Sequence, residues 1–282
     1  MRPSDRFCDR LLIAQERARS ALCVGLDVDP RRLPAGCTTD RRGIERFIRG
    51  IVEATDDLVC AYKPNLAFFE AMGSDGYAIL QTTLAAIPKG VTTIADGKRG
   101  DIGTTAERNV AAIFEQLGFD AMTVNPYQGF DSVQPYIADP ARGAFVLCKT
   151  SNPGSADFQD LECRDEDTMR PLYEVVARRA VAWNTQGNVG LVVGATYPAQ
   201  LGEVRALAPD LPILIPGVGT QGGDAEEAVR AGMARNGRLA VVNVSRQVLY
   251  ASAGPNWQEA ARAEAARLRD VMEAATASRA RL

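Results

Sequence analysis

The chain has 282 residues, of which 46% are hydrophobic and 24% are charged, as in ordinary globular proteins. Its 32 basic and 35 acidic side chains give a formal net charge of −3, so no basic excess draws it to nucleic acid or to an anionic membrane. The sequence has no histidine, which excludes a histidine base, ligand or catalytic triad and leaves acid–base chemistry to Lys, Asp, Glu, Tyr or Cys.

The first predicted element is a helix, because Phe7, Leu11, Ala14 and Ala18 recur at helical spacing. In a barrel, this helix would cover the bottom. Eight short apolar runs follow, and their near-continuous apolar character is typical of strands buried on both faces of a parallel sheet. These runs are Ala21–Asp27, Leu58–Lys63, Val91–Asp96, Asp120–Asn125, Ala144–Lys149, Val189–Gly194, Pro212–Gly217 and Leu239–Val244.

Segments with helical spacing separate the runs, for example around Ile44–Ile51, Ala111–Leu117 and Leu172–Arg179. A last amphipathic stripe, from Trp257 to Met272, predicts a C-terminal helix. Eight alternating β and α segments favour an α/β fold of the (β/α)8 TIM-barrel type over an open sheet. We therefore expect residues 1–282 to form a single barrel domain with an extra helix at each end. The polar, acidic stretch Pro153–Arg170 is predicted to be a loop with room for one helical turn.

Targeting signals are not recognised in the sequence. Its start, MRPSDRFCDRLL, lacks the apolar core and cleavage site of a signal peptide, and no apolar run approaches the roughly 20 residues that span a bilayer. The six cysteines form no C-x-x-C pair and match no zinc or disulfide framework. We expect a cytoplasmic protein with reduced cysteines and no membrane association.

Polar residues collect where the apolar runs end, which is where a barrel of this type carries its active site. Any one of them is ordinary at a strand end, but seven in register indicate a site. The polar ends include Asp27, Lys63, Asp96, Asn125, Lys149–Asn152 and Ser245–Arg246.

The densest polar segment has the form D-x-K-x-x-D, with Asp96, Lys98 and Asp101. If Asp96 ends its strand, Lys98 projects to the same side, and Lys63 from the adjacent strand adds a second positive charge. Neighbouring carboxylates stabilise the ammonium of Lys98, which is then available as a proton donor and as a counter-charge to a carbanion. The alternative is a structural cluster of ion pairs at the barrel mouth.

Two further segments suggest a phosphorylated substrate. Pro216–Asp224 contains four glycines in seven residues, and Arg246 follows the last strand. Barrels often bind phosphate with these two loops, through close backbone amides and a forked guanidinium. The alternative is a flexible glycine turn beside an unrelated arginine. Ser151–Gly154 (SNPG) is an ordinary turn sequence, and its polar groups would also suit the edge of a heterocycle.

Asp96–Ala106 (DGKRGDIGTTA) resembles the signature of the orotidine 5′-phosphate decarboxylase family, in its second bacterial subgroup. The resemblance spans nearly the whole chain in order. Its other motifs are GLDVDP (Gly25–Pro30), YKPNLAFFE (Tyr62–Glu70), VNPYQGFDS (Val124–Ser132), KTSNPGS (Lys149–Ser155), PGVGTQGGD (Pro216–Asp224) and NVSRQVLYA (Asn243–Ala251).

This resemblance implies a cofactor-free decarboxylation of orotidine 5′-monophosphate (OMP) to UMP and CO2 in pyrimidine biosynthesis. Asp96 is expected to lie against the substrate carboxylate, and Lys98 to stabilise and protonate the C6 carbanion. Lys63 and Asp101 are expected to complete the charge network and to contact the ribose.

The remaining implied contacts are with the substrate and with a second subunit. Asp27 is expected to bind the ribose hydroxyls, Ser151 the pyrimidine, and Gln221 and Arg246 the 5′-phosphate. Asp101 and Thr105 are expected to enter the neighbouring subunit's site, which implies a homodimer. No metal or organic cofactor is implied. The full set of expected substrate contacts is Asp27, Thr105, Ser151, Pro216, Gln221 and Arg246.

Three other functions compete with this reading. A Mg²⁺-dependent sugar-phosphate decarboxylase or aldolase shares D-x-K-x-x-D, but needs another carboxylate ligand and usually a histidine. A non-catalytic nucleotide binder should have lost at least one of the residues Lys63, Asp96, Lys98 and Asp101, and all are present. A fusion to a phosphoribosyltransferase finds no room, since the barrel accounts for the whole chain.

Overall fold

Eight parallel strands close into a barrel in the computed structural model, which describes residues 5–219 and 221–279. The strands follow chain order around the barrel, with one inserted hairpin lying outside it. All eight apolar runs form these strands, so the predicted (β/α)8 barrel is confirmed. The barrel strands are β1 (Leu22–Gly25), β2 (Ala61–Lys63), β3 (Thr92–Arg99), β4 (Ala121–Val124), β5 (Gly143–Lys149), β8 (Val189–Val193), β9 (Ile213–Ile215) and β10 (Ala240–Val244).

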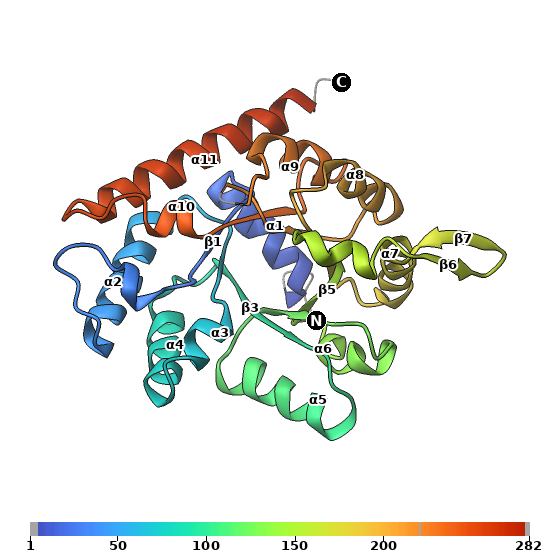
Figure 1. The fold of residues 1–282 in the computed structure, drawn as a ribbon, viewed down its shortest axis with the longest axis horizontal. Helices are drawn as coiled ribbons and strands as arrows, with labels where there is room; N and C mark the ends of the chain where they lie inside the picture. Colours follow the sequence, from blue (N-terminus) through green and yellow to red (C-terminus); the bar gives the residue numbers. More distant parts are fainter. Residues whose placement is uncertain (1–4, 220, 280–282) are drawn as a thin grey trace.

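Helices surround the barrel and connect its strands (Figure 1). The predicted C-terminal helix is present as α11, which packs along α2 and α9 on the outside of the barrel. Residues Ala111–Gln116 continue α5 as a π-helical turn. The helices are α1 (Phe7–Ala18), α2 (Arg41–Thr55), α3 (Leu66–Glu70), α4 (Ser74–Ala86), α5 (Gly103–Val110), α6 (Gln134–Ile137), α7 (Leu172–Trp183), α8 (Pro198–Leu207), α9 (Ala225–Gly232), α10 (Arg246–Leu249) and α11 (Trp257–Arg279).

Helix α1 closes the bottom of the barrel, as its apolar stripe predicted. Phe7, Leu11 and Ala14 are buried and share one apolar cluster with the residues that fill the lower barrel interior. The ring of Phe7 meets that of Phe145 edge to face, with 5.9 Å between the ring centroids. Gly143 makes room for it, since a Cβ atom there would lie only 2.4 Å from the Phe7 ring. The barrel is therefore open to ligands at the opposite end.

The segment Pro153–Arg170, predicted to be a loop, is ordered into secondary structure. A 3-10 helix (Pro153–Asp157) precedes an antiparallel hairpin of β6 (Glu162–Asp165) and β7 (Thr168–Pro171), which projects from the barrel (Figure 1). Most hairpin residues are at least partly exposed, so the apolar alternation that reveals a strand is missing. Ion pairs at 2.8 to 3.8 Å hold it instead, between the buried carboxylate of Asp165 and the guanidinium groups of Arg170, Arg178 and Arg179.

Strand β3 runs further than predicted. The expectation that it ends at Asp96 is wrong, because pairing with β4 resumes after an irregularity and Arg99 pairs with Val124. The register shift lies between Ala95 and Arg99, and this is a bulge of the kind that re-aims side chains at the rim of a barrel. Asp96 and Lys98 both lie within the bulge.

Candidate active site

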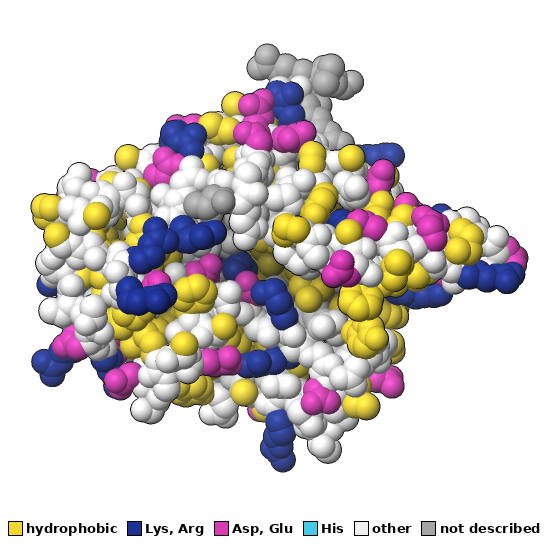
Figure 2. All heavy atoms as spheres, viewed as in Figure 1, with side chains coloured by type: hydrophobic (Ala, Val, Ile, Leu, Met, Phe, Trp, Pro, Cys, Tyr) yellow, Lys and Arg dark blue, Asp and Glu magenta, His cyan; other side chains and the backbone are white. Residues whose placement is uncertain are grey.

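A cavity of about 380 Å³ lies at the C-terminal ends of the barrel strands. It is large enough for a small ligand. Figure 2 shows it as a hollow in the middle of this face, with basic and acidic side chains gathered around it. The cavity brings together these residues predicted from the sequence: Asp27, Lys63, Asp96, Lys98, Ser151, Pro216, Gln221 and Arg246.

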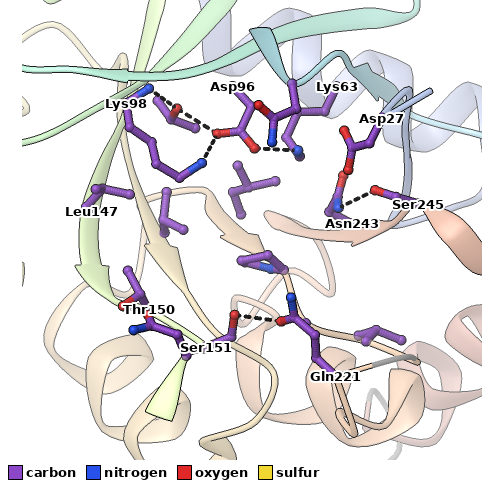
Figure 3. A pocket seen from close by; sticks show the side chains of 18 of the residues that line it. Asp27, Lys63, Asp96, Lys98, Leu147, Thr150, Ser151, Gln221, Asn243 and Ser245 are labelled. Carbon is purple, nitrogen blue, oxygen red and sulfur yellow. Dashed lines mark hydrogen bonds and ion pairs between the residues drawn. The ribbon is translucent and has the colours of Figure 1, made fainter. Parts of the chain in front are cut away.

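One carboxylate lies between two ammonium groups on one side of this cavity (Figure 3). Nζ of Lys63 is 2.7 Å from Oδ2 of Asp96, and Nζ of Lys98 is 2.5 Å from Oδ1 of Asp96. The hydroxyl of Thr123 on β4 donates a third hydrogen bond to Oδ1 at 3.1 Å. These partners fix the carboxylate in one orientation. The sequence prediction that Asp96, Lys98 and Lys63 form one network is consistent with these distances.

The bulge in β3 explains how Lys98 reaches the carboxylate on its own strand. Lys98 has a φ of 47°, in the left-handed region that residues other than glycine rarely adopt. Its backbone N–H donates to Oγ1 of Thr123 at 3.0 Å, which holds this conformation. Gly97 is tightly packed, since a Cβ atom there would lie 2.8 Å from the side chains of Leu66 and Met122. Such local strain is typical of functional positions.

Burial and charge oppose each other in this cluster, and charge prevails. Burial of Asp96 would raise the pKa of its carboxyl group, but the charges of Lys63 and Lys98 and their hydrogen bonds hold that pKa well below its ordinary value. Burial of Lys63 would lower the pKa of its ammonium, but the charges of Asp96 and Asp27 raise it above its ordinary value. Asp96 and Lys63 are therefore both ionised at neutral pH.

Asp27 presents an unsatisfied acceptor next to this cluster. Its Oδ1 is buried and has no hydrogen-bond partner among the residues that the structure describes. Asp27 lines the cavity beside Lys63 and Asn243 (Figure 3). Buried polar atoms are nearly always hydrogen-bonded in proteins, so this oxygen is suited to a hydroxyl group of a ligand.

The opposite side of the cavity combines a glycine-rich turn with an arginine, groups that are suited to an anion. Gly217, Gly219 and Gly222 have positive φ angles of 98°, 80° and 93°, conformations in which glycine is the residue of lowest cost. The turn brings Gln221 to Ser151, whose hydroxyl is 2.8 Å from Oε1 of Gln221. Arg246, at the start of α10, also lines the cavity. Thr220, within the predicted glycine segment, lies outside the described residues.

The comparisons with known proteins agree with this geometry. The family described as "Orotidine 5'-phosphate decarboxylase / HUMPS family" matches residues 20–263. The chain belongs to this family. An orotidine 5'-phosphate decarboxylase of Roseiflexus sp. (strain RS-1) is 49% identical over 274 residues, which cover 97% of this chain and 99% of that protein. The family resemblance read from the motifs is thus confirmed.

Solved structures of the family extend the agreement to three dimensions. The structure of Leishmania donovani OMP decarboxylase is 41% identical, with a TM-score of 0.82, and the match covers 96% of this chain and 98% of that one. A second relative, the orotidine 5'-phosphate decarboxylase of Roseiflexus castenholzii (strain DSM 13941 / HLO8), is 51% identical over 95% of this chain and 98% of that protein. The shared fold therefore includes the whole barrel.

Two residues that the family resemblance assigned to the site lie away from this chain's cavity. Asp101 is exposed, and its carboxylate accepts a hydrogen bond from the backbone of Ile102 at 2.8 Å. Thr105 is exposed on α5. The expected network of Asp101 with Lys63 is thus not formed within one chain. The family resemblance places both residues in the site of a neighbouring subunit, and that stays a prediction.

Several cavity residues were not assigned a role from the sequence, and three of them are polar residues close to the charged cluster. Asn65, Thr123 and Asn243 line the cavity. Asn65 follows β2 and forms an isolated bridge with Asp96. Thr123 and Asn243 lie within strands, and a polar residue inside an otherwise apolar run was the available signal. These residues were missed because the prediction considered only the polar residues at which an apolar run stops.

Proposed function

We propose that this enzyme removes CO2 from orotidine 5′-monophosphate to give UMP. The observation that carries the proposal is the fixed carboxylate of Asp96 between two ammonium groups, with an anion-binding turn across the same cavity. In the reaction, the bond between C6 and the carboxyl carbon breaks and its electron pair stays on C6. CO2 leaves, and a proton from Nζ of Lys98 moves to C6.

The substrate is placed by its charges. Its phosphate binds at the glycine turn with Gln221 and Arg246, and its ribose hydroxyls meet the unsatisfied oxygen of Asp27. The pyrimidine then lies between Ser151 and the lysines, with its carboxylate against Asp96. Contacts to the distant phosphate provide binding energy that orients the reacting carbon.

Preorganised charge supplies the catalysis. The carboxylates of substrate and Asp96 repel each other in the ground state, and loss of neutral CO2 removes that repulsion. The ammonium of Lys98 already lies at the site where negative charge develops, so it needs no reorganisation as the bond breaks. The same group then acts as the general acid. Asp96 keeps Lys98 in place throughout.

We also infer that the active enzyme is a homodimer. Asp101 and Thr105 follow Lys98 by only a few residues and are exposed. A second copy packed on this edge of the barrel would receive both side chains into its own cavity. The partner supplies groups to the ribose side of the site, where Asp27 is unsatisfied.

A cytoplasmic location completes the proposal. All six cysteines are free, as expected in a reducing compartment. Among the described residues, no helix is long and apolar enough to span a membrane.

The same part of the chain contains no group of three or more His, Cys, Asp or Glu side chains arranged to hold a metal ion.

The decisive experiment follows the absorbance of OMP as it meets the purified enzyme in excess EDTA. Conversion to UMP that disappears in Lys98→Ala supports the proposal. Thermal stabilisation by OMP or UMP without turnover points instead to a nucleotide binder. Turnover of a sugar phosphate only when Mg²⁺ is present points to the metal-dependent alternative.

A further inference from the structure

Lys149 is a buried lysine beside the active site that the proposed mechanism does not use. It is the last residue of β5, its side chain is 0% exposed, and it does not line the cavity. Taking an ammonium out of water is unfavourable, and an apolar side chain would fill the same space without this penalty. The charge therefore requires an explanation other than packing.

The ammonium is held by the segment that follows it in the chain. Nζ of Lys149 donates to Oδ1 of Asp160 at 2.6 Å and to Oγ of Ser155 at 3.2 Å. The ring of Tyr197, which follows β8, lies with its centroid 4.6 Å from the same nitrogen. The hydroxyl of Tyr197 also contacts the carbonyl of Asn152 at 3.4 Å. The Lys149 ammonium thus contacts the far end of residues 150–160 directly, and it contacts the near end through Tyr197.

This segment carries a predicted substrate contact. Ser151 lies near its start and meets Gln221 across the cavity at 2.8 Å. Next to Ser151, the backbone N–H of Thr150 donates to Oε1 of Gln159 at 2.8 Å. This hydrogen bond also links the two ends of the segment. The position of Ser151 therefore depends on how the far end of the segment, at Asp160, is anchored.

We propose that Lys149 is a positioning residue, whose ion pair with Asp160 holds residues 150–160 folded so that Ser151 stays beside Gln221. This inference rests on the proposed function, in which Ser151 contacts the pyrimidine and Gln221 the phosphate. Lys149 touches neither the substrate nor the reacting carbon. Without the pair, substrate must order the segment each time it binds, and the lost entropy weakens binding.

Asp160→Ala is the primary test, because the Asp160 side chain is 41% exposed and its removal takes away little packing in the barrel interior. We expect KM for OMP to rise about tenfold or more, because the cost of ordering residues 150–160 is then paid when the substrate binds. We expect kcat to change less than about threefold, because the bound complex reaches the same geometry before the chemical step. Asp160→Glu keeps the carboxylate and should restore most of the change. A wild-type KM in Asp160→Ala, or no rescue by Asp160→Glu, overturns the inference.

A matched control separates this effect from the general loss of an ion pair. Asp57 pairs with Arg262 at 2.7 Å on the outside of the barrel, and Asp57→Ala should leave KM unchanged. Lys149→Met combined with Asp160→Ala should raise KM no further than Lys149→Met alone, because the two residues act as one unit. Independent, multiplying effects in the double variant count against the pair.

Hydrogen exchange tests the anchor without any turnover. In the free protein, Asp160→Ala should speed amide exchange of residues 150–160 about tenfold or more, with the barrel strands unchanged. Faster exchange throughout the barrel, or none in the segment, overturns the positioning role. If the wild-type enzyme does not convert OMP, the proposed function fails, and this measurement still decides the role of Lys149.

Discussion

The ammonium of Lys63 lies 2.7 Å from Oδ2 of Asp96, and the two side chains are only 3% and 11% exposed. They come from neighbouring strands, β2 and β3, so the parallel pairing of these two strands brings them together. A buried pair of this kind stabilises little by itself, but removal of one partner leaves an uncompensated charge in the protein interior. The pair therefore couples the folding of the barrel mouth to its chemistry.

The contribution of this ion pair to the free energy of unfolding should depend on pH. Asp96→Asn should lower the free energy of unfolding at pH 7 by about 3 kcal/mol. The pKa of Asp96 is lowered on folding, so its contribution is complete above the ordinary carboxyl pKa of about 4 and is lost as pH falls below it. Urea unfolding of both proteins near pH 7 and pH 3 checks this. A difference that does not shrink in acid contradicts the assignment.

Loss of the Lys98 ammonium should abolish catalysis and spare the fold. Its side chain is 48% exposed, so Lys98→Ala removes little packing. We expect kcat to fall at least about a thousandfold, because both the counter-charge and the proton donor are lost. Circular dichroism and the melting temperature should stay close to wild type. Appreciable residual decarboxylation would remove Lys98 from the role of proton donor.

The assignment of Arg246 is tested by a substrate without phosphate. Arg246→Ala should raise KM for OMP about tenfold to a hundredfold, the effect of one lost charge-assisted hydrogen-bond set. The same change should barely alter the turnover of orotidine, which has no phosphate to lose. Steady-state kinetics with the two substrates gives the comparison. Equal losses for both would place Arg246 outside the phosphate site.

Shared active sites predict complementation between inactive variants. Asp101→Ala and Lys98→Ala should each be inactive, but their mixed dimer has one site with both residues intact. Co-expression should restore about a quarter of wild-type activity, since about half of randomly formed dimers are mixed. Separate purification of the two homodimers provides the control. A mixture that stays inactive would show that Asp101 does not act across the interface.

The bottom helix offers a test of the fold away from the chemistry. Leu11 is 0% exposed beneath the barrel, and Leu11→Ala should destabilise the protein by about 2 to 4 kcal/mol through the cavity it leaves. Ile13, on the same helix, is 52% exposed, and Ile13→Ala should change stability little. Both variants should keep the wild-type kcat. An equal effect of the two substitutions would contradict the role of α1 as the helix that closes the bottom of the barrel.

The barrel was predictable from the sequence because its strands are buried on both faces. Runs such as Val189–Gly194 are rich in valine and leucine and are too short for most helices, so their length and composition favour buried strands. The hairpin at residues 162–171 was not predictable, because the buried carboxylate of Asp165 and its arginine partners hold it rather than alternating apolar residues. That the whole of residues 1–282 forms one domain stays a prediction.

The site residues that follow the ends of apolar runs could be found from the sequence. The backbone conformation of the site and any contact with a second chain could not. Asp96 lies within ion-pair distance of both Lys63 and Lys98, which is consistent with the expected network. The left-handed conformation of Lys98 was hidden, because it depends on a hydrogen bond to Thr123 from the next strand. Asp101 marks the other limit, since it is exposed away from its own chain's cavity and periodicity within one chain carries no signal for contacts with a second copy.

The two halves of the cavity are carried by different strands, and this has an evolutionary consequence. The charged cluster belongs to β2 and β3, whereas the glycine turn and Arg246 follow β9 and β10. Mutations in one half leave the anchor in the other half in place. A descendant of this barrel can therefore acquire a new reaction while it retains the glycine turn and Arg246, to which we assign phosphate binding, so the scaffold is modular at the level of single strands.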